Sequence, residues 1–74
     1  GDVLNSEEEV EIRRINLENA TRLGNNEHYK VKIVFGAEEG LLMVHTTVWT
    51  ITSNYISLKG GVSIPVKRIY EVIL

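Results

Sequence analysis

The side chains best suited to acid–base or metal chemistry in this chain are two histidines, His28 and His45, which stand 17 residues apart. There is no cysteine, and the only aspartate is Asp2. Catalytic and metal sites need several such groups converging on one point. Two histidines this far apart, with no aspartate or cysteine near them, give only a weak metal signal. The sequence therefore predicts neither a bound metal nor a cofactor.

Other candidate reactive groups also lack the partners that catalysis requires. Leu58-Lys59-Gly60-Gly61 places a lysine beside glycines, but a phosphate loop needs a longer glycine frame that leads into a helix. Glu38-Glu39 falls in a predicted turn, where acidic pairs usually serve solvation. No motif places a base beside any of the three serines near the C-terminus, Ser53, Ser57 and Ser63. We therefore expect a protein that is not an enzyme.

Charge is unevenly distributed along the chain. Residues 1–27 carry a net charge of −4 and residues 28–74 carry +2, which gives −2 in all. Dedicated nucleic-acid-binding proteins usually carry a basic stripe and a high isoelectric point, whereas the isoelectric point here is about 5.6. Nucleic acid is therefore only an alternative partner.

Contact with a protein partner is the first expectation. Tyr55 combines an apolar ring with a polar tip, as contact surfaces favour, although it could instead stack across the sheet on Thr52. The alternative, RNA binding, would need one continuous basic surface free of glutamate, with tyrosines for stacking. The candidate contact residues for both readings are Tyr55, Lys59, Lys67, Arg68, Lys30 and Lys32.

The N-terminal part divides into an acidic leader, residues 1–15, which we expect to be partly disordered or helical, and a domain over residues 16–74. Ser6 and Glu9 form a capping-box pattern, and Glu9–Arg13 and Glu18–Arg22 are spaced for i,i+4 ion pairs. The apolar residues of this region make a poor helical stripe, however. A short helix over about residues 16–23, ended by Gly24, is therefore favoured over a continuous helix from residue 7.

From residue 28 onward the hydrophobic period changes to two, which indicates strands. Residues 29–35 form the first strand. Residues 41–52 are rich in β-branched residues and are apolar on both faces, which is typical of a long strand that bends and serves two sheets. A four-residue loop over 37–40 would pair Phe35 with Leu42 and would require a bulge near Thr46–Thr47, whereas a five-residue loop would require none.

The later turns set a register. A two-residue loop at 53–54 places Ile51 opposite Ile56 and Trp49 opposite Leu58, which makes Trp49 a core residue. A three-residue loop at 59–61 places Ile56 opposite Ile64, with Gly61 in the left-handed conformation. Pro65 ends that strand, residues 66–68 form one turn, and residues 69–74 form the last strand. The predicted core is Val31, Ile33, Phe35, Val44, Trp49, Ile51, Ile56, Leu58, Val62, Ile64, Ile69 and Val72.

This order of a short helix, a strand, a long bent strand, two short strands, one turn and a closing strand resembles SH3-like small barrels, and within them the Sm-like proteins. The resemblance covers residues 16–74 and implies a mainly β fold in which five strongly bent antiparallel strands close into a barrel. Sm-like proteins contact RNA through an Asp and an Asn in the second and third strands. The corresponding tip here, 52–55, offers only Asn54.

Self-association is a further expectation. Tyr70, Val72, Ile73 and Leu74 place apolar groups on both faces of the last strand, and such a strand needs two covers. The barrel would supply one cover, and either the N-terminal helix or a second subunit would supply the other. A second subunit would also close an open sheet edge. No apolar run is long enough for a membrane span, so we expect no membrane partner.

The compartment stays open, with the cytoplasm favoured. The chain begins with Gly1 rather than Met, as in a processed chain, an excised domain or a tag remnant.

Overall fold

The computed structural model describes residues 1–74, and its first element is a single long helix, α1 (Glu7–Glu27). Ser6 caps it as expected, since its side-chain oxygen accepts a hydrogen bond of 3.1 Å from the Glu9 backbone N–H. The preference for a short helix over residues 16–23 is therefore wrong. The buried stripe of α1 consists of Arg13, Leu17, Ala20 and Gly24, which recur at helical spacing. Because two of these four residues are not hydrophobic, the apolar pattern alone understated the helix.

The predicted ion pairs of the helix are also replaced by others. Arg14 bonds to both Glu11 and Glu18, and Arg13 bonds to Asp2 instead of Glu9. Gly24 lies inside α1 rather than after its end. The helix ends where His28 adopts a left-handed conformation (φ 54°) and its N–H donates to the Gly24 carbonyl. Histidine is one of the residues that tolerate this conformation.

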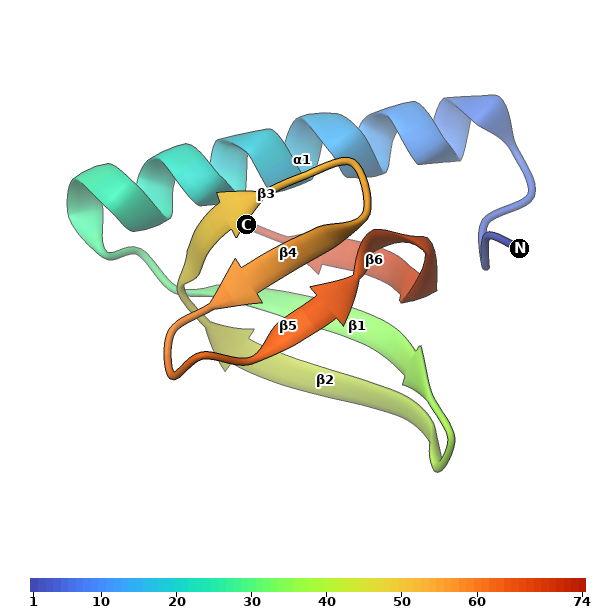
Figure 1. Cartoon of the computed structure of the whole chain (residues 1–74). Coiled ribbons are helices and arrows are strands. Elements are labelled where there is room, and N and C mark those ends of the chain that lie inside the picture. Colours follow the sequence, from blue (N-terminus) through green and yellow to red (C-terminus); the bar gives the residue numbers. More distant parts are fainter.

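Six strands follow the helix, and they form two sheets of three strands each (Figure 1). The first sheet has the order β2-β1-β6 and consists of β1 (Val31–Ala37), β2 (Gly40–Thr46) and β6 (Ile69–Ile73). The second has the order β3-β4-β5 and consists of β3 (Val48–Ile51), β4 (Tyr55–Leu58) and β5 (Ser63–Pro65). A 3-10 turn, η1 (Val66–Arg68), connects β5 to β6. The helix packs on β3 and β6, and the turn of the β1–β2 hairpin lies at the far end of the molecule.

The predicted five-stranded closed barrel is wrong. The two sheets are separate and neither closes on itself, because no strand of one sheet pairs with a strand of the other. The long strand predicted over residues 41–52 is interrupted at Thr47 and becomes β2 and β3, which belong to different sheets. At the other junction Pro65 ends β5 after three residues, and the turn that follows leads into β6, which pairs with β1 of the first sheet. The mainly β character with an N-terminal helix is confirmed.

The pairing of the hairpins follows the predicted registers with one exception. Phe35 lies opposite Leu42, Ile51 opposite Ile56, and Ile56 opposite Ile64. Gly61 has a positive φ angle of 84°, as predicted for the three-residue loop, and Gly60 has one of 94°. The exception is Trp49, since a bulge in β3 leaves it unpaired.

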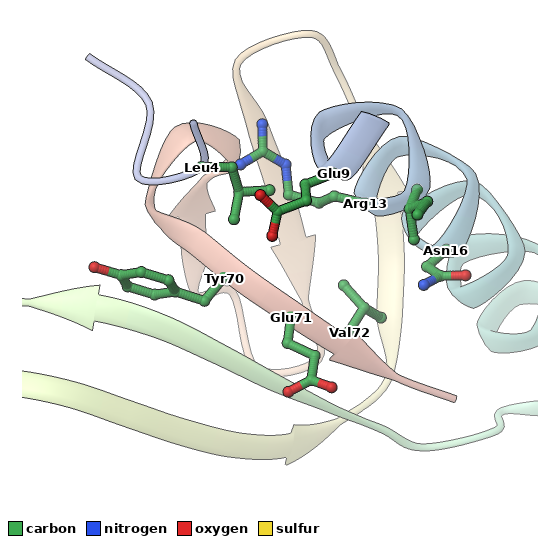
Figure 2. Close-up of a pocket in the computed structure, with 8 residues that line it drawn as sticks. Leu4, Glu9, Arg13, Asn16, Tyr70, Glu71 and Val72 are labelled. Atoms are coloured by element: carbon green, nitrogen blue, oxygen red, sulfur yellow. The ribbon is translucent and has the colours of Figure 1, made fainter. Parts of the chain in front are cut away.

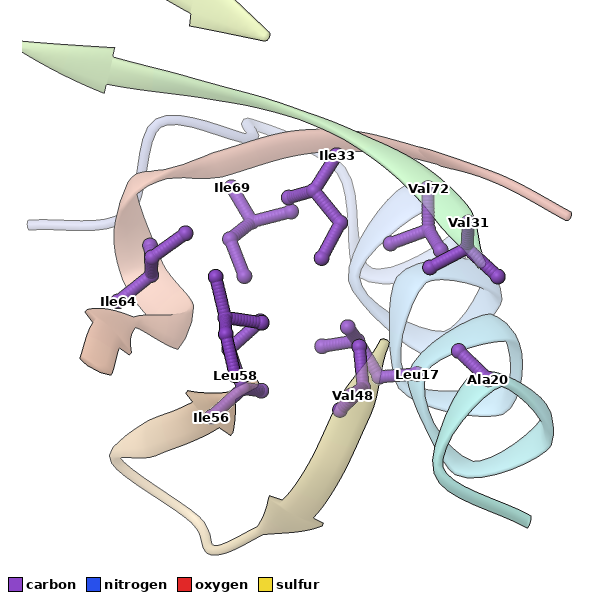
Figure 3. Close-up of a cluster of buried hydrophobic side chains, with 10 residues drawn as sticks. All are labelled: Leu17, Ala20, Val31, Ile33, Val48, Ile56, Leu58, Ile64, Ile69 and Val72. Atoms are coloured by element: carbon purple, nitrogen blue, oxygen red, sulfur yellow. The ribbon is translucent and has the colours of Figure 1, made fainter. Parts of the chain in front are cut away.

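The core lies between the two sheets and α1 (Figure 3). It consists of Leu17, Ala20, Val31, Ile33, Val48, Ile56, Leu58, Ile64, Ile69 and Val72, with Phe35, Val44, Ile51 and Val66 partly buried against it.

Two predicted core residues are wrong. The bulge puts Val48 rather than Trp49 opposite Leu58. Trp49 is half-buried, and its ring stands nearly perpendicular to that of His28, with an interplanar angle of 81° and the two ring centroids 5.5 Å apart. Val62 precedes β5, in the turn with the two glycines, and 55% of its surface is exposed.

Candidate interaction surface

The six contact residues predicted from the sequence are all exposed, and they lie in two groups. Tyr55, on β4, and Lys67, in η1, line a shallow hollow of about 300 Å³ together with Asn54 and Pro65. Arg68 lies next to Lys67, and its Nε donates a hydrogen bond of 3.0 Å to the carbonyl of Gly36, near the end of β1. The first group therefore surrounds η1.

The second group surrounds the beginning of β1. Lys30 precedes Val31, which pairs with Thr46, and Lys32 lies opposite His45. Lys59 lies near this end too, because its backbone N–H donates a hydrogen bond to the carbonyl of Thr47, which follows Thr46 in the chain. Since β1 rises about 3.3 Å per residue, Lys32 and Gly36 are roughly 13 Å apart along the strand. The two groups of contact residues thus lie near opposite ends of β1.

Acidic groups accompany the basic residues around η1. Glu38 lines a second hollow, of about 450 Å³, together with Lys67 and Arg68. Lys67 also contributes to the field that lowers the pKa of Asp2. This end of the molecule therefore carries charge of both signs, whereas nucleic-acid surfaces need a concentration of positive charge.

An apolar surface that the sequence did not reveal lies along β2. Three successive residues, Leu41, Leu42 and Met43, have 65%, 39% and 56% of their surface exposed. Leu41 and Met43 point to the side of the sheet away from the core, opposite Gly36 and Val34, whereas Leu42 lies opposite Phe35 on the core side. We call these three residues the β2 strip. Leu41 and Met43 therefore lie side by side on one exposed face, and adjoining apolar residues on a protein surface commonly mark interaction sites.

The β2 strip lies on a free sheet edge, because β2 pairs with β1 alone. The other edges carry protection of the kind that limits edge-to-edge association. At β6, the guanidinium of Arg13 donates to the Ile69 carbonyl at 3.1 Å, and α1 packs alongside. At β3, α1 again packs alongside. β5 is only three residues long and ends in Pro65. β2, in contrast, has seven residues and no charged residue or proline.

A groove of about 420 Å³ is lined by residues of both α1 and β6 (Figure 2). Glu9, Arg13 and Asn16 line it from the helix, and residues 70–72 line it from β6. The side chain of Arg13 is 4% exposed and forms two bonds to the Asp2 carboxylate, of 2.8 and 2.5 Å. These bonds lower the pKa of Asp2 to about 2. The positive charge of Arg13 in this groove is therefore already paired with the carboxylate of Asp2 in the same chain.

The structure contains no cluster of metal-ligating side chains. No three His, Cys, Asp or Glu residues lie close enough together to hold a metal ion. His28 contacts Trp49 at the end of α1, whereas His45 lies in β2 beside Lys32. The two histidines therefore belong to different environments.

No protein-family model, curated protein sequence or solved structure matches this chain. Its one long helix is too polar to span a membrane. The candidate function is therefore argued from the exposed residues of this chain.

Proposed function

We propose that this chain is a non-catalytic assembly module that associates with other copies of itself through β2. The observation that carries the proposal is the β2 strip, three consecutive exposed apolar side chains on the one long sheet edge without protection. Such an edge offers unpaired backbone N–H and C=O groups beside apolar side chains. Pairing with another strand would give the backbone groups hydrogen-bond partners and would remove the apolar side chains from water.

The size of the surface sets the expected strength of association. Full burial of a Leu or Met side chain contributes about 1.5–3 kcal/mol, and the strip residues are already 35–61% covered in the single chain. Association also costs several kcal/mol in lost translational and rotational freedom. We therefore expect weak association that depends on protein concentration.

Sedimentation equilibrium of the purified chain tests the proposal. The mean mass should rise above 8.4 kDa as the concentration approaches about 1 mM, where a contact of ~4 kcal/mol is half-populated. Met43→Lys should weaken association at least about tenfold, because it places a charge on the edge. Val62→Lys is the matched control, since Val62 is equally exposed but lies in the turn before β5. A wild-type mass of 8.4 kDa at every concentration would contradict the proposal.

A further inference from the structure

The sequence of β2 is compatible with pairing to itself over its whole length. A two-fold axis perpendicular to a sheet pairs a strand antiparallel with its copy and keeps residues of the same face opposite each other. When the axis passes through Met43, all seven residues from Gly40 to Thr46 are paired. Any other centre leaves residues at the strand ends without a partner.

The contacts in this register are favourable. Met43 lies opposite Met43 of the second copy, Leu42 opposite Val44, and Leu41 opposite His45. No charged residue stands in β2, so no like charges meet across the new ladder. Gly40, which has no side chain, lies opposite Thr46.

The flanking residues add charge complementarity. Glu38 and Glu39 form the exposed turn immediately before β2. Continuing the register by one position places Glu39 beside Thr47 of the second copy. The carbonyl of Thr47 accepts the backbone N–H of Lys59. The acidic turn of each copy therefore approaches the end of the molecule that carries Lys59 and Lys30 in the other.

We infer that two copies of this chain pair β2 with β2 in antiparallel orientation about Met43 and so join their three-stranded sheets into one continuous sheet of six strands. This inference rests on the proposed function and specifies its geometry. It selects a second copy over an unrelated partner because one strand supplies both sides of a full-length, charge-free ladder. The pairing would leave both copies of α1 and both β3-β4-β5 sheets in place.

Engineered disulfides test the register, since the chain contains no cysteine of its own. Directly opposite residues of antiparallel strands have Cα atoms about 4.5–5.5 Å apart, within the range a disulfide spans. Met43→Cys should therefore form covalent dimers under mild oxidation at least about tenfold faster than the control Tyr55→Cys, an equally exposed position on the other sheet.

Leu41→Cys and His45→Cys provide the second arm, because they leave Met43 intact. Mixed in equal amounts, these two variants should cross-link at roughly half the rate of Met43→Cys, because random pairing places a Leu41→Cys copy against a His45→Cys copy in half of the dimers. Each alone should not, because the two copies of Leu41 would be about 13 Å apart along the strands. Cross-linking of Leu41→Cys with itself would overturn the register.

A charge exchange tests the flanking contact. Glu39→Lys should weaken association severalfold, and Glu39→Lys with Lys59→Glu in the same chain should restore it. If the double variant does not restore association, Glu39 of one copy does not contact Lys59 of the other. If the mass shows assembly but Met43→Cys does not cross-link, the pairing is wrong and the proposed function stands. If no assembly occurs at any concentration, both fail.

Discussion

At the scale of single residues, Arg13 anchors the N-terminal segment. Its nearly buried guanidinium bonds to the Asp2 carboxylate and to the Ile69 carbonyl, so it joins residues before α1 to the beginning of β6. The backbone N–H of Val3 also donates to the Lys67 carbonyl. A buried charge stripped of its partner is strongly destabilising. Asp2 is therefore a structural residue of this fold.

The Asp2–Arg13 pair gives a pH-dependent prediction. Hydrogen bonding to Arg13 lowers the pKa of Asp2 from 3.8 to about 2, so the folded state binds the proton more weakly than the unfolded state does. The pair's contribution is complete above about pH 4 and is lost as the pH falls through 2. The free energy of unfolding of Asp2→Asn, measured by urea denaturation, should lie about 1–2 kcal/mol below that of the wild type at pH 7.

The two denaturation curves should approach each other as the pH falls towards 2 and meet below it, because the wild-type carboxyl becomes protonated as the pH passes its folded-state pKa of about 2. Glu7→Gln is the control, since Glu7 is exposed in the first turn of α1. A gap between Asp2→Asn and the wild type that is the same at pH 7 and pH 2 would show that the charge of Asp2 contributes nothing.

At the scale of elements, the contact of α1 with β3 depends on Gly24. A Cβ atom at this position would collide with the Val48 carbonyl oxygen and would stand 3.0 Å from Cγ2 of Thr47. Both are parts of the chain where β2 ends and β3 begins. The absence of a side chain at residue 24 therefore lets the helix approach the backbone at the point where the chain passes from one sheet to the other.

Gly24→Ala should destabilise the protein, although the same change normally stabilises a helix interior by about 1 kcal/mol. The collision is with backbone, which cannot rotate away, so we expect a loss of about 1–3 kcal/mol. Thermal unfolding followed by circular dichroism measures it. Asn26→Ala, at an exposed position of the same helix, should be neutral or slightly stabilising. A melting temperature of Gly24→Ala equal to or above that of the wild type would contradict the close approach.

The element scale also shows what the sequence predicted and what it could not. Alternation of apolar residues, with the turn glycines, correctly paired Ile51 with Ile56 and Ile56 with Ile64. The length of α1 was missed because a buried arginine and a buried glycine complete its core-facing stripe. The core position of Trp49 was wrong because a one-residue bulge reverses the faces of a strand. The Phe35–Leu42 register required a bulge near Thr46–Thr47, but the bulge lies between Val48 and Thr50.

At the scale of the whole molecule, two features could not be predicted from the sequence. One is whether the sheets close into a barrel, and the other is which apolar residues are exposed. Whether two sheets merge depends on pairing across the junctions at Thr47 and η1, which alternation within a strand does not report. Likewise, the residues of β2 are as hydrophobic as those of a strand that is buried on both faces, so the sequence alone does not indicate that they are exposed. Their exposure follows from the place of β2 at the sheet edge and from the extension of the β1–β2 hairpin beyond the core. Self-association was predicted from the last strand, but the edge of that strand is the one Arg13 and α1 protect.

Hydrogen exchange of the β2 amides at different protein concentrations tests the central claim most directly. Every second residue of β2 turns its N–H away from β1, and such amides exchange with solvent when the edge is free. On raising the concentration from about 1 μM to 1 mM, these amides should become protected, whereas amides of β5 should exchange at a constant rate. Protection in β2 that does not change with concentration, in a sample whose mass shows association, would place the contact elsewhere on the molecule.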